Sequence, residues 1–285
     1  MKDVDAVIVG AGPAGTSAAL VLGRCNRRIV LLGDGPTRNA AARHGHNLFS
    51  RDHAPPAIVA AEARQQLDRY PSITVTASRA TTLRRPAEDR FEVTTADGDT
   101  LSAEAVILAT GTADDLPPVT GLADLWGVRA HTCPYCDAWE YTGRRLLVVG
   151  RGADVLAEKL SRWTDDLVVD DGDPATGPVV AAVEVDVDHV RVQWDSGADT
   201  AVDGIFVVTD KRPRSDLARQ VGAEIRDTGH VVVDALQSTS IDGVYAAGDC
   251  AVRYDESHPI EQVAVAAGDG VRAGIAVDDG LANPD

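Results

Sequence analysis

The sequence predicts an α/β protein in which the same strand, glycine turn and helix pattern occurs twice. Residues 4–9 are apolar except for Asp5, the loop at residues 10–15 has glycine at its first, third and sixth positions, and residues 13–24 are rich in alanine and leucine. The pattern begins again at residue 146. A strand, glycine loop and helix followed by a second strand form the dinucleotide-binding βαβ unit. We therefore expect two Rossmann-like, three-layer dinucleotide-binding domains.

The other predicted elements alternate between strands and turns. Strands are expected at residues 28–32, within the β-rich stretch 73–93, and at 103–108, 146–149, 167–170 and 204–208, with a ribbon near 183–192 and a last helix at 260–277. The simplest architecture is a discontinuous first domain, residues 1–113 and 238–285. A second domain, residues 114–237, is inserted into it and is shortened, because little chain separates its helix from the strand at residue 204.

Composition limits the classes of function. The chain has 285 residues, of which 44% are hydrophobic and 25% charged, and no apolar run approaches the ~18 residues that a membrane span requires. The first residues lack the pattern of a secretory signal, so that we expect a cytoplasmic protein without membrane partners. The net charge of −17 argues against nucleic acid as a partner, since phosphate binding needs a basic surface.

The first glycine loop predicts a dinucleotide site. Gly10 allows a tight turn, Gly12 allows a pyrophosphate to approach the backbone, and Gly15 allows the helix to pack closely on the strand, while Pro13 and Ala14 begin that helix. The alternative is a tight turn without a ligand.

The acidic residue expected to bind ribose is displaced by one position. Gly33 occupies the usual place at the end of the second strand, and Asp34 follows it. Asp34 is either a ribose ligand or a solvated turn residue.

Cys133 and Cys136 are the predicted redox centre. Two thiols at this spacing at a helix start can form a small disulfide ring, and a lowered thiolate pKa there makes one sulfur a nucleophile. Asp137 follows directly and can accept the proton that dithiol oxidation releases. Half of a zinc site is the alternative, but Cys25 and Cys250 stand alone, so that no metal is predicted. His131 either tunes the thiols or is structural.

The ordered motifs resemble the thioredoxin reductase-like, FAD-dependent pyridine nucleotide-disulfide oxidoreductases. The resemblance rests on four segments, 10–15, 109–112, 133–136 and 246–249. Four further segments, 36–40, 126–127, 133–140 and 162–166, resemble the dithiol oxidase branch, whose members close disulfides in gliotoxin, holomycin and romidepsin biosynthesis.

The resemblance implies FAD as the cofactor and a homodimer as the assembly. It implies that Cys136 faces the flavin and that Cys133 meets the substrate. It also adds flavin-site candidates to the glycine loop: Arg38, Asn39, His46, Thr110, Gly111, Gly248, Asp249, Gln262 and Val263.

The chain departs from the thioredoxin reductases in its second glycine turn. Val155 replaces the third glycine, and residues 170–173 read Asp-Asp-Gly-Asp where those enzymes carry arginines for the NADPH 2′-phosphate. Carboxylates repel a phosphate, so that NADPH is disfavoured, whereas an acidic residue about 20 positions after Gly150 is compatible with NADH. Asp137 itself resembles the reductases, because dithiol oxidases often have histidine there.

Three functions follow from these observations. The leading hypothesis is a dithiol oxidase that uses oxygen and acts on a small-molecule or peptide dithiol. The second is a disulfide reductase that receives electrons from NADH, NADPH or ferredoxin and reduces a thioredoxin-like protein. The third is a flavin-binding redox sensor that does not turn over.

Overall fold

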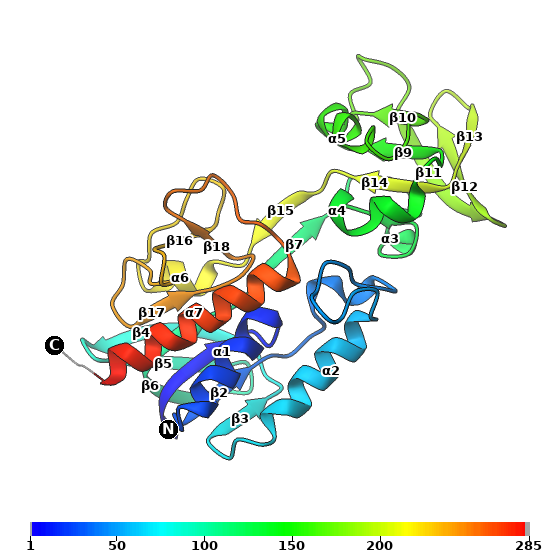
Figure 1. Ribbon diagram of the computed structural model, residues 1–285. Helices are drawn as coiled ribbons and strands as arrows, with labels where there is room; N and C mark the ends of the chain where they lie inside the picture. Colours follow the sequence, from blue (N-terminus) through cyan, green and yellow to red (C-terminus); the bar gives the residue numbers. More distant parts are fainter. Residues whose placement is uncertain (1, 283–285) are drawn as a thin grey trace. The chain divides into compact units, whose positions relative to one another are not determined.

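The computed structural model describes residues 2–282 and divides the chain into two compact units (Figure 1). Unit 1 contains Met1–Arg38, Ala57–Ala113 and Arg212–Asp285, and unit 2 contains Asn39–Pro56 and Asp114–Lys211. The predicted α/β class with two Rossmann-like units is confirmed.

Unit 1 is built on a seven-stranded sheet in the order β3-β2-β1-β6-β5-β4, with β17 also paired to β6. Strands β1, β2, β3, β6 and β17 pair in parallel, whereas β4 and β5 form an antiparallel extension. The elements are β1 (Lys2–Val9), α1 (Pro13–Arg24), β2 (Ile29–Leu32), α2 (Pro56–Leu67), β3 (Ile73–Thr76), β4 (Ala80–Ala87), β5 (Arg90–Thr95), β6 (Thr100–Leu108), α6 (Asp216–Gln220), β16 (Val231–Val233), β17 (Val244–Ala246), β18 (Ala251–Arg253) and α7 (Val263–Ala282).

Both faces of this sheet are buried. Successive residues of β1 point to opposite sides, so that Val7 packs with Leu217 of α6 in one apolar cluster and Ile8 packs with Ala18 of α1 in another. This double burial explains why residues 6–9 are continuously apolar rather than alternating.

Helices α1 and α7 run side by side (Figure 1) and pack through small residues. A Cβ atom on Gly270 would overlap the carbonyl oxygen of Ala14, and one on Gly274 would lie 3.1 Å from the carbonyl oxygen of Ala18. The two glycines are four residues apart, so that they lie on one face of α7 and let its axis approach α1.

Unit 2 has a four-stranded parallel sheet, β10-β9-β14-β8, and an antiparallel ribbon, β11-β12-β13. The ribbon covers one face through Val183 and Val192, and α5 covers the other through Ala157 and Leu160. The elements within the unit are α3 (Leu122–Leu125), β8 (Ala130–His131), α4 (Pro134–Asp137), η2 (Ala138–Tyr141), β9 (Leu146–Val149), α5 (Ala153–Leu160), β10 (Leu167–Asp170), β11 (Val180–Asp186), β12 (His189–Trp194), β13 (Asp199–Val202) and β14 (Gly204–Val207). Three further elements extend across the bounds between the units along the chain: η1 (Arg38–Ala41), β7 (Thr112–Asp115) and β15 (Asp210–Pro213).

The compact units differ from the expected domain boundaries 1–113, 114–237 and 238–285. The chain leaves unit 2 at Lys211, because α6 packs against β4 and β16 pairs with β18, both in unit 1. The segment Asn39–Pro56 joins unit 2, where a Cβ atom on Gly127 would overlap the backbone of Ala41. Both differences arise from long-range packing, which local patterns do not report.

Candidate active site

Cys133 and Cys136 form a disulfide at the start of α4. Cys133 is the N-cap residue, and its Sγ accepts a hydrogen bond from the backbone N–H of Cys136 at 3.2 Å. Pro134 occupies the first helical position, where a missing N–H costs nothing. The structure therefore joins the two predicted cysteines in a disulfide, and a backbone donor is in place to stabilise a thiolate at Cys133.

A hydrogen-bonded chain of side chains begins at Asp137. Its Oδ1 lies 3.2 Å from His131 Nδ1, and His131 Nε2 lies 3.0 Å from the Tyr141 hydroxyl. Burial raises the pKa of the Tyr141 phenol, which keeps it protonated and therefore a donor. If Tyr141 donates to Nε2, the neutral ring carries its proton on Nδ1 and donates it to Asp137.

The strand β8 fixes the position of His131. This residue pairs with Phe206 of β14, and its ring, which is only 9% exposed, lies 5.5 Å from the Tyr141 ring and 5.8 Å from the Phe206 ring. The sequence left the role of His131 open. The structure assigns it a contact with the carboxylate that follows Cys136.

A residue that the sequence did not single out contacts the turn between the two cysteines. Asn47 Nδ2 donates a hydrogen bond of 2.9 Å to the carbonyl oxygen of Tyr135. Asn47 has a φ of +61°, a left-handed conformation that asparagine tolerates better than most residues. The segment Asn39–Pro56 is thus tied to the disulfide turn.

Three aromatic side chains of unit 2 are exposed, two of them close to the disulfide in sequence. Tyr135 lies between the two cysteines and is 57% exposed, with Lys159 Nζ 5.2 Å from its ring centroid. Trp139 follows Asp137 by two residues and is 75% exposed, and Phe49 of the Asn39–Pro56 segment is 95% exposed. Exposed aromatic side chains of this kind are candidate substrate contacts.

The glycine loop of unit 1 has the steric properties expected of a pyrophosphate cradle. Gly10 has a φ of +110°, and a Cβ atom there would overlap the carbonyl oxygen of Ala109, whereas a Cβ atom on Gly15 would overlap that of Gly10. A Cβ atom on Gly12 would meet nothing within 4 Å. Helix α1 starts directly afterwards at Pro13 without a side-chain cap. The N–H groups at the start of α1 thus lack a side-chain partner, which is the arrangement that binds an anion at a helix N-terminus.

Several predicted flavin-site residues converge in unit 1. Arg38 forms ion pairs with Asp249 at 3.0 Å and with Glu261 at 3.1 Å. A Cβ atom on Gly248 would lie 3.1 Å from the Ala14 Cβ and 3.3 Å from that of Ala266. The 248–249 turn therefore lies beside the start of α1 and the first turns of α7. Gln262 and Val263, which are predicted to lie over the flavin, stand at the beginning of that helix.

The other predicted flavin-site residues either form contacts within unit 1 or lie in unit 2. Asp34 pairs with Arg79 Nε at 2.8 Å, so that its carboxylate has a protein partner. The Thr110 hydroxyl donates to the carbonyl oxygen of Arg214 at 2.6 Å, and Gly111 accepts a hydrogen bond from the Arg214 N–H at 2.9 Å. Asn39 and His46 belong to unit 2. Their assignments to a flavin stay predictions.

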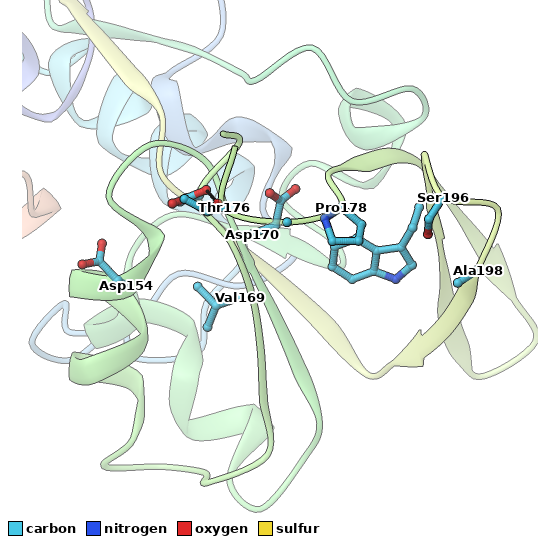
Figure 2. Close-up of a pocket in the computed structure, with 10 residues that line it drawn as sticks. Asp154, Val169, Asp170, Thr176, Pro178, Ser196 and Ala198 are labelled. Carbon is cyan, nitrogen blue, oxygen red and sulfur yellow. Dashed lines mark hydrogen bonds between the residues drawn. The ribbon is translucent and has the colours of Figure 1, made fainter. Parts of the chain in front are cut away.

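The second glycine turn adjoins an acidic cavity in unit 2. Gly150 and Gly152 both have positive φ angles between β9 and α5. A cavity of about 520 Å³ is lined in part by Asp154, Asp171 and Trp194 (Figure 2 shows Asp154 beside it).

The carboxylates of this cavity are held in place by hydrogen bonds. Asp170 is buried and accepts hydrogen bonds from the N–H groups of Gly172 and Val180. Hydrogen bonds from the N–H of Asp173 and the hydroxyl of Thr176 lower the pKa of Asp171. The cavity therefore keeps negative charge at neutral pH.

The fold and the disulfide define a class of protein, a two-domain dinucleotide-binding disulfide oxidoreductase. Residues 4–161 and 153–270 match the model of the family described as pyridine nucleotide-disulphide oxidoreductase. The chain belongs to this family of flavoproteins and is an oxidoreductase. Within residues 2–282, no helix is both long and apolar enough to cross a bilayer.

Individual relatives agree with this assignment. The chain is 32% identical to "Thioredoxin reductase sirT" of Leptosphaeria maculans over 96% of its length and 93% of the relative. A match of 36% identity to "Probable thioredoxin reductase" of Arthroderma benhamiae covers 51% of this chain and 37% of that protein. The crystal structure of HlmI superposes with a TM-score of 0.89 at 30% identity, over 98% of this chain and 93% of HlmI. The resemblance to thioredoxin reductase-like proteins is thereby confirmed.

Proposed function

We propose that this protein is an FAD-dependent dithiol oxidase that needs no NADPH. The observation that carries the proposal is the combination of a complete C-x-x-C centre with carboxylates in the cavity beside the second glycine turn. Negative charge there opposes binding of a 2′-phosphate. Electrons would therefore enter through the disulfide rather than from NADPH. The sequence segments that resemble the dithiol oxidase branch also support electron transfer from a substrate dithiol through the disulfide to FAD.

The proposed reaction starts with thiol-disulfide exchange. One substrate thiolate attacks Cys133 Sγ and displaces the Cys136 thiolate, and the second substrate thiolate then displaces Cys133 from the mixed disulfide. The substrate leaves as a disulfide, and the protein holds two cysteine thiols. Bound FAD would accept two electrons from this pair and pass them to oxygen, so that a dithiol and O2 give a disulfide and H2O2.

The side chains around the disulfide would accept the proton that is released when the cysteine thiols are oxidised. Asp137 is adjacent to Cys136 and would accept the proton released when that thiol is reoxidised. His131 would act as a positioning residue, because its Nδ1 lies 3.2 Å from Asp137 Oδ1 while its Nε2 contacts the Tyr141 hydroxyl. Tyr135 and Trp139 would offer apolar contacts to the substrate dithiol, which is a small molecule or a peptide in this proposal.

Unit 1 would hold the FAD. The pyrophosphate would bind at Gly12 and the start of α1, and the 248–249 turn would bind the ribityl-phosphate region. The N-terminus of α7, with Gln262 and Val263, would stabilise the negative charge of a reduced ring. A homodimer in the cytoplasm is part of this proposal.

A disulfide reductase is the second candidate, because the names of several relatives contain thioredoxin reductase. In that case the electron donor would be NADH, bound in the cavity at the second glycine turn, or ferredoxin. The substrate would be the disulfide of a thioredoxin-like protein. An aromatic side chain, Trp194, lines the cavity and offers a surface on which an adenine could stack.

The deciding experiment is an anaerobic titration of the purified flavoprotein with NADH, NADPH or a simple dithiol, followed by flavin absorbance. The oxidase should bleach with the dithiol alone and recover in air with release of H2O2. Rapid bleaching by a nicotinamide would instead establish the reductase. A single redox change without turnover in excess dithiol and air would indicate a redox sensor.

A further inference from the structure

We propose that His46, His53 and Glu140 form a binding site for a divalent transition metal ion in unit 2. Each residue offers one ligand atom, and these atoms lie within 4.8 Å of one another. His46 Nε2 lies 3.4 Å from Glu140 Oε1. Two imidazoles and one carboxylate are a donor set that binds Zn²⁺ and leaves a coordination position open for water. None of the three proposed ligands is a cysteine of the Cys133–Cys136 disulfide.

A carboxylate lies beside the other nitrogen of the His46 ring. Asp52 Oδ1 lies 3.7 Å from His46 Nδ1 and accepts a hydrogen bond of 2.9 Å from the backbone N–H of Asn47. A carboxylate on Nδ1 favours a ring that presents its Nε2 lone pair to a metal. Nε2 is the nitrogen that faces Glu140. Asp52 is therefore a nearby carboxylate partner for the nitrogen of His46 that would not bind the ion.

The backbone conformation of His53 suggests that its imidazole is retained for a function. His53 has a φ of +63°, a left-handed conformation that glycine adopts at lower cost. Its ring stacks on that of His44 with a centroid distance of 4.0 Å and an interplanar angle of 14°, which fixes the ring's orientation. A strained backbone that retains an oriented imidazole points to a functional site rather than a simple turn.

The proposed metal would join two segments beside the disulfide. His46 and His53 lie in Asn39–Pro56, and Glu140 lies in η2, directly after the helix that carries Cys136. Asn47 of the same segment already holds the carbonyl oxygen of Tyr135. The ion would thus fasten the Asn39–Pro56 segment to the C-x-x-C region. Because His53 and Glu140 are exposed, the ion can enter from solvent.

The test uses the chelator-treated flavoprotein with its disulfide oxidised and its exposed Cys25 alkylated, so that neither Cys25 nor the Cys133–Cys136 pair can bind metal. Calorimetric titration with Zn²⁺ should show one site per chain, and hydrogen exchange in residues 39–56 should slow when Zn²⁺ binds. His53→Gly and Glu140→Gln should each weaken binding by more than about 10-fold, since even loss of an outer-shell partner costs that much. His44→Phe keeps the stacked ring without a ligand nitrogen and should bind Zn²⁺ as the unmodified protein does.

His53→Gly also separates ligand loss from misfolding, because glycine suits the backbone at this position. Its melting temperature without metal should equal or exceed that of the unmodified protein, while the Zn²⁺-induced increase should disappear. No saturable Zn²⁺ binding, or equal affinity in His53→Gly and the unmodified protein, would overturn the proposal and leave His46 with ion pairs only.

Discussion

His131 Nδ1 lies 3.2 Å from Asp137 Oδ1, and this contact connects a buried ring to the carboxylate that follows Cys136. The other ring nitrogen lies 3.0 Å from the hydroxyl of Tyr141. A carboxylate held in this way has a fixed direction, so that it does not need to be ordered at each turnover. Asp137 is therefore better prepared for proton transfer than a solvated surface aspartate.

We expect Asp137→Asn to slow reduction of the flavin by a dithiol on the order of 100-fold or more, because the amide cannot accept a proton. Rapid anaerobic mixing with a dithiol measures this step directly. Asp165→Asn removes an exposed carboxylate elsewhere in unit 2 and serves as the matched control. An unchanged rate in Asp137→Asn would show that another group accepts the proton.

Tyr141 predicts a pH dependence of stability. Burial raises the pKa of its phenol above the unfolded value of about 10, so that the folded state favours the protonated form. This contribution is complete below pH ~10 and is lost as pH rises through the folded pKa. Tyr141→Phe should lower the free energy of unfolding by about 0.5–1.5 kcal/mol at pH 7 through its lost hydrogen bond.

Urea unfolding at pH 7 and at pH above 10 tests this expectation. The difference between Tyr141→Phe and the unmodified protein should shrink at the higher pH, because only the unmodified protein loses the contribution of the buried phenol. Tyr254→Phe, at a site 67% exposed, should change neither value. A difference that stayed constant with pH would refute the proposed effect of burial.

The sequence predicted the elements that depend on local patterns. Helix α1 and strands β9 and β10 have the expected bounds, because a glycine turn precedes α1 and each strand is a short apolar run followed by a glycine turn. Helix α2 was not predicted, since Pro56–Leu67 alternates small, charged and amide side chains without a clear apolar stripe. The end of unit 2 at Lys211 was also missed, because it depends on the pairing of β16 with β18.

In the candidate site, too, local sequence features were predictable and contacts between distant residues were not. The spacing of Cys133 and Cys136 is visible in the sequence, and Asp137 is their direct neighbour. Asn47 is far from them along the chain, and only folding brings its amide to the carbonyl oxygen of Tyr135. The contact between His131 and Asp137 likewise depends on the path of the chain between β8 and α4. The cluster of His46, His53 and Glu140 was also not predicted, because Glu140 is far from the two histidines along the chain.

The two cysteines outside the disulfide should differ in reactivity. Cys250 is fully buried, and burial raises the pKa of its thiol, whereas Cys25 is exposed. The pKa of Cys25 is also raised, first by partial desolvation and then by Asp278. In the native, oxidised protein, an alkylating reagent should modify Cys25 slowly and Cys250 not at all. Mass spectrometry of peptides measures both, and urea should expose Cys250; native labelling of Cys250 would contradict its burial.

Two glycines of α7 provide a matched test of the contact between α1 and α7. A Cβ atom on Gly270 would overlap the carbonyl oxygen of Ala14, next to the glycine loop, whereas one on Gly268 would meet nothing within 4 Å. Gly270→Ala should therefore lower the free energy of unfolding by about 1–3 kcal/mol and weaken FAD retention. Gly268→Ala is exposed in the same helix and should stabilise the protein by up to about 1 kcal/mol.

Urea unfolding and the flavin content after gel filtration measure the two effects. Because both variants add the same methyl group to one helix, helix propensity favours both, and only the contact with Ala14 distinguishes them. Equal stability and equal flavin content in the two variants would show that α1 and α7 are not packed as closely as the glycine at position 270 requires. A loss of flavin in Gly270→Ala alone would instead connect this helix contact to the shape of the pyrophosphate loop.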